Sequence, residues 1–287
     1  MLRLIDRLFE AVDKKGHVCL GLDTAPDYLP ESFFKGHSSA GEAIFCFNRR
    51  IIEATLDAVA VYKVQIAYYE ALGLDGLAAY AKTLAFLRKN GAIVIADVKR
   101  GDIAKTAEMY AKAHFSGEFE ADFITVNPFM GMDTLSPFYP WLKTGDKGIF
   151  SLVATSNPGA SDIEGLICKD GASVSEKLGA MIKSEGEAFM GACGYGAVGA
   201  VVGCTNKEQT VSIRERMPGV FFLIPGYGAQ GGKAEDMKNY FVNGNGGVVN
   251  SSRGILLAYK KDERPIPFDE AARGEVLRMR DDIRNAI

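Results

Sequence analysis

The chain is 287 residues long, with 47% hydrophobic and 24% charged residues, and its formal net charge is −3. This composition is ordinary for a folded globular protein with enough apolar material for a core. A charge this close to neutral excludes the strongly basic field that binds nucleic acid or anionic membranes, although a local basic site for a phosphate stays open.

The start of the chain, MLRLIDRLFEAVDKKG, has apolar residues at helical spacing, interrupted by the acids Asp6, Glu10 and Asp13. A secretory signal peptide has an uninterrupted apolar segment instead. No apolar run approaches the roughly 20 residues that span a bilayer. We therefore expect a soluble, cytoplasmic protein that begins with an amphipathic helix.

Cysteine and histidine usage argues against a disulfide framework and against a zinc or histidine-rich metal centre. The chain has five cysteines, an odd number, and none of them form a C-x-x-C pair. Its three histidines lie far apart in the sequence: His17, His37 and His114. Free thiols in a reducing compartment fit this pattern best, and we expect no metal ion or other cofactor.

Short apolar runs recur along the chain and are continuous rather than alternating. Such runs are typical of strands that are buried on both faces of a parallel sheet. In chain order we predict strands within residues 17–23, 59–65, 92–97, 122–127, 148–154, 199–203, 220–225 and 247–252.

Helical patterns lie between these runs. They cover residues 41–56, 76–91, 104–117, 175–192, 233–244 and 268–287. Eight strands alternating with helices predict an α/β fold, a (β/α)8 TIM barrel, formed by residues 1–287 as a single catalytic domain. An open doubly wound sheet is the alternative. Two long connections, 24–40 and 155–174, are expected to be functional loops.

Polar residues gather where the predicted strands end, which is where barrel enzymes carry their active sites. Asp23 ends the first strand, Lys63 lies in the second, and Asp97 and Lys99 end the third. Thr125 and Asn127 end the fourth strand, and Thr155 and Ser156 follow the fifth.

The stretch ADVKRGDI places Asp97, Lys99 and Asp102 at the junction of the third strand and the next helix. Asp97 and Lys99 are two residues apart and therefore share a face, and Lys63 is in register with Val61. Asp102 could cap the helix that follows. The cluster could be ordinary ion pairs, or it could hold a protonated lysine against a developing carbanion.

A phosphate site is predicted after the seventh and eighth strands. PGYGAQGG at 225–232 includes Gln230 and Gly231, and NSSRG at 250–254 contributes Arg253. Loops at these two places form the recurrent phosphate site of TIM barrels, although two glycine-rich turns would look the same. The glycines also spell G-x-G-x-x-G, but the acid that a dinucleotide site requires is missing between Met237 and Lys261.

With these motifs the chain resembles the orotidine 5′-monophosphate decarboxylases, and within them a longer bacterial subgroup that carries D-x-K-R-G-D-I. The resemblance runs from GLD at 21–23 to SSRGI at 251–255, with DVKRGDI and GAQGG as its specific parts. It implies a cofactor-free lyase of pyrimidine biosynthesis that converts orotidine 5′-monophosphate to uridine 5′-monophosphate (UMP) and carbon dioxide.

The resemblance also implies roles for individual residues. Lys99 would protonate the carbon that loses carbon dioxide, Asp97 would face the departing carboxylate, and Lys63 would contact the ribose and the neighbouring acid. The others would bind substrate or cross the interface of a homodimer: Asp102, Ile103 and Thr106 from the partner subunit, Asp23 at the ribose, Ser156 at the pyrimidine, and Gln230 and Arg253 at the phosphate.

Two other functions stay open. One is a magnesium-dependent sugar-phosphate decarboxylase or aldolase of the same superfamily, which shares D-x-K-x-x-D but has an acid where this chain has Lys63. The other is a catalytically idle nucleotide-binding barrel. An idle barrel has no physical reason to concentrate charges at its mouth.

Overall fold

Eight parallel strands close into a barrel in the computed structural model of the chain. The structure describes residues 2–204, 207–228, 231–261 and 266–287, with residues 207–210 in backbone only. The strands are β1 (Val18–Gly21), β2 (Val61–Gln65), β3 (Val94–Arg100), β4 (Phe123–Val126), β5 (Gly148–Ala154), β6 (Gly196–Val202), β7 (Val220–Ile224) and β8 (Gly247–Ser251).

Each strand pairs with its neighbour in sequence, and β8 pairs with β1, where Val18 lies opposite Val249. This closure confirms the TIM barrel and rules out the open doubly wound sheet. All eight predicted strands are confirmed, with ends that differ by a few residues.

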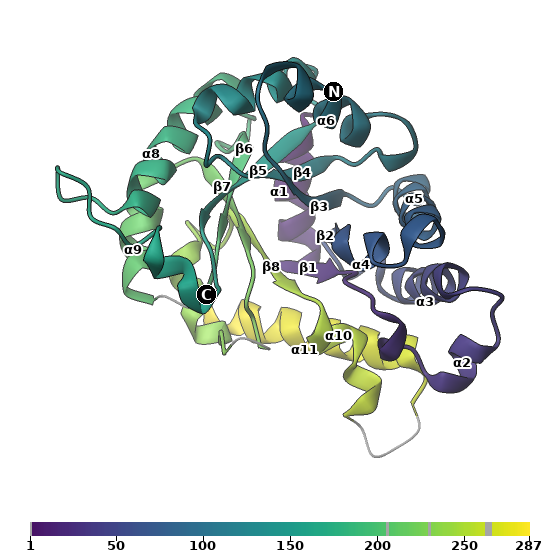
Figure 1. Cartoon of the computed structure of the whole chain (residues 1–287). Helices are drawn as coiled ribbons and strands as arrows, with labels where there is room; N and C mark the ends of the chain where they lie inside the picture. Colours follow the sequence, from purple (N-terminus) through teal and green to yellow (C-terminus); the bar gives the residue numbers. More distant parts are fainter. Residues whose placement is uncertain (1, 205–206, 229–230, 262–265) are drawn as a thin grey trace.

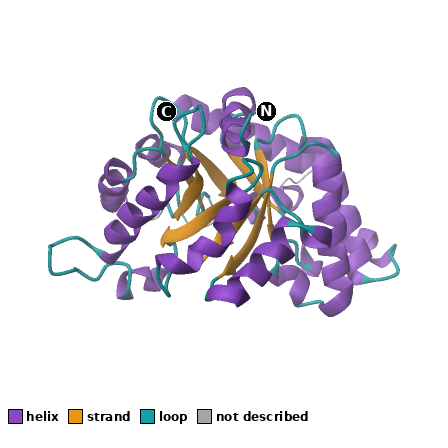
Figure 2. Ribbon diagram, turned by 90° about the horizontal axis from the view of Figure 1, so that it is seen from above, coloured by secondary structure: helices purple, strands orange, loops and turns teal. Residues whose placement is uncertain are grey.

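Helices surround the strands (Figures 1 and 2). They are α1 (Leu4–Lys15), α2 (Glu31–Lys35), α3 (Ala40–Thr55), α4 (Ala67–Glu70), α5 (Gly73–Lys89), α6 (Ala104–Phe115), α7 (Tyr139–Leu142), α8 (Val174–Gly186), α9 (Lys207–Arg216), α10 (Arg253–Leu256) and α11 (Phe268–Ala286). The predicted helices at 41–56, 76–91, 104–117, 175–192 and 268–287 are confirmed as α3, α5, α6, α8 and α11. In the part of the chain that the structure describes, no helix has the length and apolar content needed to cross a bilayer.

The helix predicted over 233–244 differs from the structure. Only residues Ala234–Tyr240 are helical there, and they form a 3₁₀ helix. Met237 and Tyr240 are its buried residues, and they are three positions apart, which aligns them on one face of a helix with three residues per turn. Phe241 is already extended, so the chain turns back toward β8.

Two apolar clusters lie on the two sides of the strands. The outer cluster packs the helices against the barrel. The inner cluster includes Val61, Ile95, Phe123 and Phe150 from the strands, and Leu8 from the buried face of α1. The helix α1 therefore covers the amino-terminal end of the barrel, and the carboxyl-terminal end, the mouth, is left for polar side chains.

Candidate active site

The mouth of the barrel holds a chain of alternating charges, in which Lys63 and Asp97 are buried and Lys99 is half-exposed. The Nζ of Lys63 on β2 lies 2.9 Å from Asp23 Oδ1 and 3.2 Å from Asp97 Oδ2. The Nζ of Lys99 lies 2.6 Å from Asp97 Oδ1. Asp97 is therefore shared by two lysines, as the sequence predicts for residues on the inner faces of β2 and β3.

Asp97 is held ionised by its neighbours. Burial would raise the pKa of this carboxyl, but the ammonium groups of Lys63 and Lys99 outweigh burial and lower the pKa to about 2. Burial would likewise lower the pKa of Lys63, and the carboxylates of Asp23 and Asp97 raise it instead. Both groups are charged at neutral pH, so the site presents fixed charges in a region of low dielectric.

The backbone is strained at Lys99. Its φ is +43°, in the left-handed region that non-glycine residues rarely occupy. The pairing of β3 with β4 shifts at the same place, because Ala96 lies opposite Ile124 and Arg100 opposite Val126. The side chain of Lys99 is 47% exposed, whereas that of Asp97 is 9% exposed, so the lysine reaches outward over a buried acid.

Asp23 is oriented by β8. Its Oδ1 accepts from Lys63, and its Oδ2 accepts from the hydroxyl of Ser252 at 2.7 Å. Gly21 makes this approach possible, because a Cβ at that position would come within 1.9 Å of the Ser252 Oγ. A residue that directly follows β8 therefore helps to fix the carboxylate that follows β1.

Two adjoining cavities open at the mouth. The first, of about 220 Å³, is lined by Lys99, Thr125 and Ser156 among others. The second, of about 290 Å³, is lined by Asp23, Tyr68 and Arg253 among others. The two share four lining residues: Lys63, Asp97, Pro225 and Asn250. They form one groove from Ser156 to Arg253, and among the described residues no acid pairs with the exposed Arg253 side chain.

Asp102, Ile103 and Thr106 line neither cavity of their own chain. They lie on the surface beyond β3, where Ile103 is 57% exposed. The predicted capping of α6 by Asp102 is wrong: its carboxylate accepts from the N–H of Ile103, which is itself the N-cap residue. Asp102 thus stabilises the turn before the helix.

Asn127 also lies outside both cavities; its side chain is exposed and accepts from the N–H of Phe129. Gly231 has φ +91° and donates its N–H to Gly228 O within the turn after β7. This amide is therefore occupied. Gln230 falls outside the described residues.

Two side chains that hold the site received no role from the sequence. Gln65 Nε2 donates to Asp97 Oδ2 at 2.8 Å, and Ser252 donates to Asp23. Gln65 could have been found, because it is two residues after Lys63 on the same face of β2. Ser252 could not, because its partner Asp23 follows β1, near the other end of the chain.

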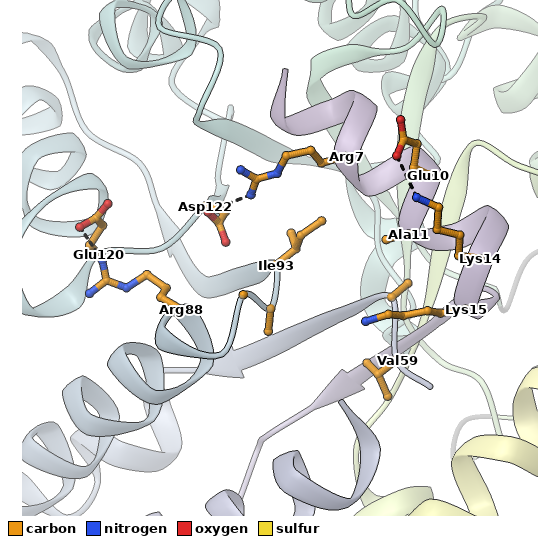
Figure 3. Close-up of a pocket in the computed structure, with 13 residues that line it drawn as sticks. Arg7, Glu10, Ala11, Lys14, Lys15, Val59, Arg88, Ile93, Glu120 and Asp122 are labelled. Atoms are coloured by element: carbon orange, nitrogen blue, oxygen red, sulfur yellow. Dashed lines mark hydrogen bonds and ion pairs between the residues drawn. The ribbon is translucent and has the colours of Figure 1, made fainter. Parts of the chain in front are cut away.

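A larger cavity, of about 580 Å³, lies at the opposite end of the barrel. Figure 3 shows its lining, with Arg7 reaching from α1 toward Asp122 and Lys14 paired with Glu10. These charged groups are at the amino-terminal ends of the strands, away from the groove at the mouth. All five cysteines carry free thiols. Within the described ranges, no group of three His, Cys, Asp or Glu side chains is arranged to hold a metal ion.

Comparison with known proteins identifies the family of the chain. The model of the orotidine 5′-phosphate decarboxylase / HUMPS family matches residues 16–264. Orotidine 5′-phosphate decarboxylase of Clostridium kluyveri is 56% identical over 281 residues, which cover 98% of this chain and 97% of that protein. The enzyme of the same name from Clostridium acetobutylicum is 57% identical over 285 residues, covering 99% and 100% of the two chains.

Comparison with a solved structure gives the same fold and a related name. The structure of Leishmania donovani OMP decarboxylase superimposes with a TM-score of 0.78 at 28% identity, over 99% of this chain and 98% of that one. The family match covers most of the chain, and identity to the bacterial relatives is high over nearly their full length. The chain belongs to the orotidine 5′-phosphate decarboxylase / HUMPS family.

Proposed function

We propose that the protein decarboxylates orotidine 5′-monophosphate to UMP, the last step of pyrimidine nucleotide synthesis, without a cofactor. The observation that carries this function is the Lys63–Asp97–Lys99 arrangement at the mouth of a barrel of this family, with the buried Asp97 between two ammonium groups. A magnesium-dependent sugar-phosphate lyase explains this arrangement less well, because it has an acid at the position where this chain has the ammonium of Lys63. An idle barrel explains it less well because it has no physical reason to concentrate charges at its mouth.

The proposed reaction follows from the charges. The bond between C6 of the pyrimidine and the carboxylate breaks, carbon dioxide leaves, and the electron pair stays on C6. The ammonium of Lys99 stabilises this pair and transfers one proton to C6, and solvent then reprotonates the amine. Asp97 lies beside the substrate carboxylate in this arrangement, and its repulsion is relieved when carbon dioxide departs.

The groove runs from Ser156 to Arg253, and we propose that it orders the substrate from base to phosphate. We assign the pyrimidine edge to Ser156, a ribose hydroxyl to Asp23, and the phosphate to Arg253, whose guanidinium lacks a carboxylate partner among the described residues. Gln230 is proposed to add a side-chain donor to the phosphate site, whereas Gly231 donates its N–H within the turn and adds no free donor. Binding energy from the phosphate would serve to align the distant reacting carbon.

We also propose that the protein acts as a homodimer in the cytoplasm, with Asp102, Ile103 and Thr106 completing the partner's site. An exposed apolar patch surrounds these residues: Ile103 (57% exposed), Met109 (49%), Phe129 (78%) and Met130 (47%). The N–H of Asn127 donates to Arg100 O at 2.8 Å, so the loop that carries Phe129 lies against the loop that carries Asp102. A patch of this kind is typical of an interface.

The dimer is tested by Phe129→Asp. A charge at the centre of an apolar interface should convert the protein to monomers in sedimentation velocity, with loss of decarboxylase activity on dilution. Leu74→Asp is the matched control, because Leu74 is 85% exposed at the start of α5 and away from the patch. A fully active monomer would remove Asp102 from the partner's site.

The activity is tested by the fall in ultraviolet absorbance of orotidine 5′-monophosphate with purified protein in excess EDTA. We expect fast loss that the chelator does not slow, with UMP as product. No loss would refute the proposed function, and turnover of sugar phosphates that appears only with added magnesium would favour the alternative lyase.

A further inference from the structure

The bulge in β3 leaves two backbone donors without partners on the neighbouring strand. Ala96 lies opposite Ile124 and Arg100 opposite Val126, so residues 97–99 of β3 face the single residue Thr125 of β4. Extra residues of this kind interrupt the ladder of backbone hydrogen bonds. In the interrupted stretch the N–H of Val98 is buried and that of Lys99 is partly buried, so both need other acceptors.

One hydroxyl satisfies both donors. The Oγ1 of Thr125 accepts from the N–H of Val98 at 3.0 Å and from the N–H of Lys99 at 2.9 Å. The same hydroxyl donates to Asp97 Oδ1 at 2.8 Å. Thr125 is 1% exposed, so water does not compete for these contacts.

The hydrogen-bonding capacity of Thr125 is therefore used up within the protein. A hydroxyl has one donor and two acceptor lone pairs, and all three are occupied by residues 97, 98 and 99. Although Thr125 lines the first cavity, its hydroxyl has nothing left to offer a substrate. Its action is on the two groups that the proposed reaction uses, Asp97 and Lys99.

We propose that Thr125 is a positioning residue: its hydroxyl holds the β3 bulge and the left-handed conformation of Lys99, and so fixes Lys99 and Asp97 in their working arrangement. This inference rests on the proposed decarboxylase function for its kinetic consequence. A displacement of about 1 Å at a reacting group can cost about 100-fold in rate. The hydroxyl should therefore matter to kcat far more than to substrate binding.

Three variants test this. Thr125→Val keeps the shape of the side chain and removes the hydroxyl, whereas Thr125→Ser keeps the hydroxyl and removes the methyl group. Ser151→Ala is the matched control, because Ser151 is a buried hydroxyl on the adjacent strand β5 that has no hydrogen-bond partner among the described residues. For each, kcat and KM for orotidine 5′-monophosphate are measured together with amide hydrogen exchange over residues 94–103.

We expect Thr125→Val to lower kcat about 100-fold with KM within about threefold of the wild type. The amides of Val98 and Lys99 should exchange about tenfold faster in this variant. Thr125→Ser and Ser151→Ala should leave kcat within about fivefold of the wild type, and exchange unchanged.

The inference is overturned if Thr125→Val keeps its kcat, or if Thr125→Ser loses as much as Thr125→Val, since the methyl group would then be what matters. Wild-type protein that does not decarboxylate the nucleotide would refute the proposed function instead. The exchange measurement does not depend on activity, so it still decides in that case whether Thr125 holds the bulge.

Discussion

The two ends of the barrel both collect charged side chains, but they arrange them differently. At the mouth, Lys63 and Asp97 are 6% and 9% exposed, and Asp97 accepts from side chains on three strands. At the base, Lys14 and Glu10 are 72% and 45% exposed and pair within one helix, four residues apart (Figure 3). The cavity at the base, of about 580 Å³, is larger than either of the two cavities that form the groove.

The difference identifies which physical features distinguish a reactive cluster from solvated ion pairs. Exposed pairs are screened by water and contribute little, so neither their number nor the size of the cavity beside them indicates chemistry. At the mouth, burial strengthens each interaction, several strands fix one carboxylate, and the strained φ of Lys99 is maintained by its surroundings.

The largest effect is expected from removing an acid. Asp97→Ala leaves Lys63 buried with one carboxylate in place of two, and removal of a partner from a buried ion pair typically costs about 3–5 kcal/mol. Glu10→Ala at the base should cost less than about 1 kcal/mol, because its pair with Lys14 is exposed. Urea unfolding of both variants measures the two values. Equal losses would show that burial does not separate the two ends.

The next effect concerns pH and His17, which lies just before β1 at the base and is 4% exposed. Burial lowers the pKa of this imidazole to about 4 from 6.5, although its bond to Gly244 O opposes the shift. A histidine with a lowered folded pKa stabilises the protein fully above pH 6.5, and this contribution is lost as the pH falls through about 4.

We expect His17 to contribute up to about 3 kcal/mol at neutral pH. His114 has a pKa lowered to about 4 by burial as well, so the free energy of unfolding should decrease from pH 6.5 to 4 in the wild type. In His17→Gln the amide can keep the bond to Gly244 O. The variant should take up about one proton fewer on unfolding in this pH range, so its free energy of unfolding should decrease less steeply. An unchanged slope would contradict the burial of a neutral His17.

A smaller effect is expected from the arginines. Arg253→Ala should raise KM about 10- to 100-fold, because a charge-assisted contact to a phosphate contributes about 1.5–3 kcal/mol. Arg7→Ala should leave KM unchanged, because the guanidinium of Arg7 lies at the base, 3.9 Å from Asp122. Steady-state kinetics distinguish the two, and an unchanged KM in Arg253→Ala would remove this residue from the phosphate site.

Most of the fold could be predicted because it depends on local patterns. Continuous apolar runs identify buried parallel strands, and eight of them alternating with helices favour the barrel, although only the pairing of β8 with β1 excludes an open sheet. The segment 233–244 was predicted incorrectly because its apolar residues fit an α-helix as well as the 3₁₀ helix that forms. The sequence does not reveal where a short segment must end to let the next strand begin.

The charged groups of the site could be predicted from their places at strand ends, but the contacts that orient them could not. Lys63, Asp97 and Lys99 each follow from position along a single strand. The bulge at Lys99 and the triple role of Thr125 depend on the register between β3 and β4, which no local pattern specifies. The contact between Ser252 and Asp23 joins the segments that follow the last and the first strand, and the two residues are 229 positions apart.

The most direct test compares one lysine at each end, by measuring the decarboxylation rate of orotidine 5′-monophosphate with Lys99→Ala and with Lys14→Ala. Removing the proton donor and its charge should lower kcat at least about 10³-fold in Lys99→Ala, with the protein still folded. Lys14→Ala should match the wild type. Substantial turnover by Lys99→Ala would contradict the assignment of the reaction to the mouth lysine.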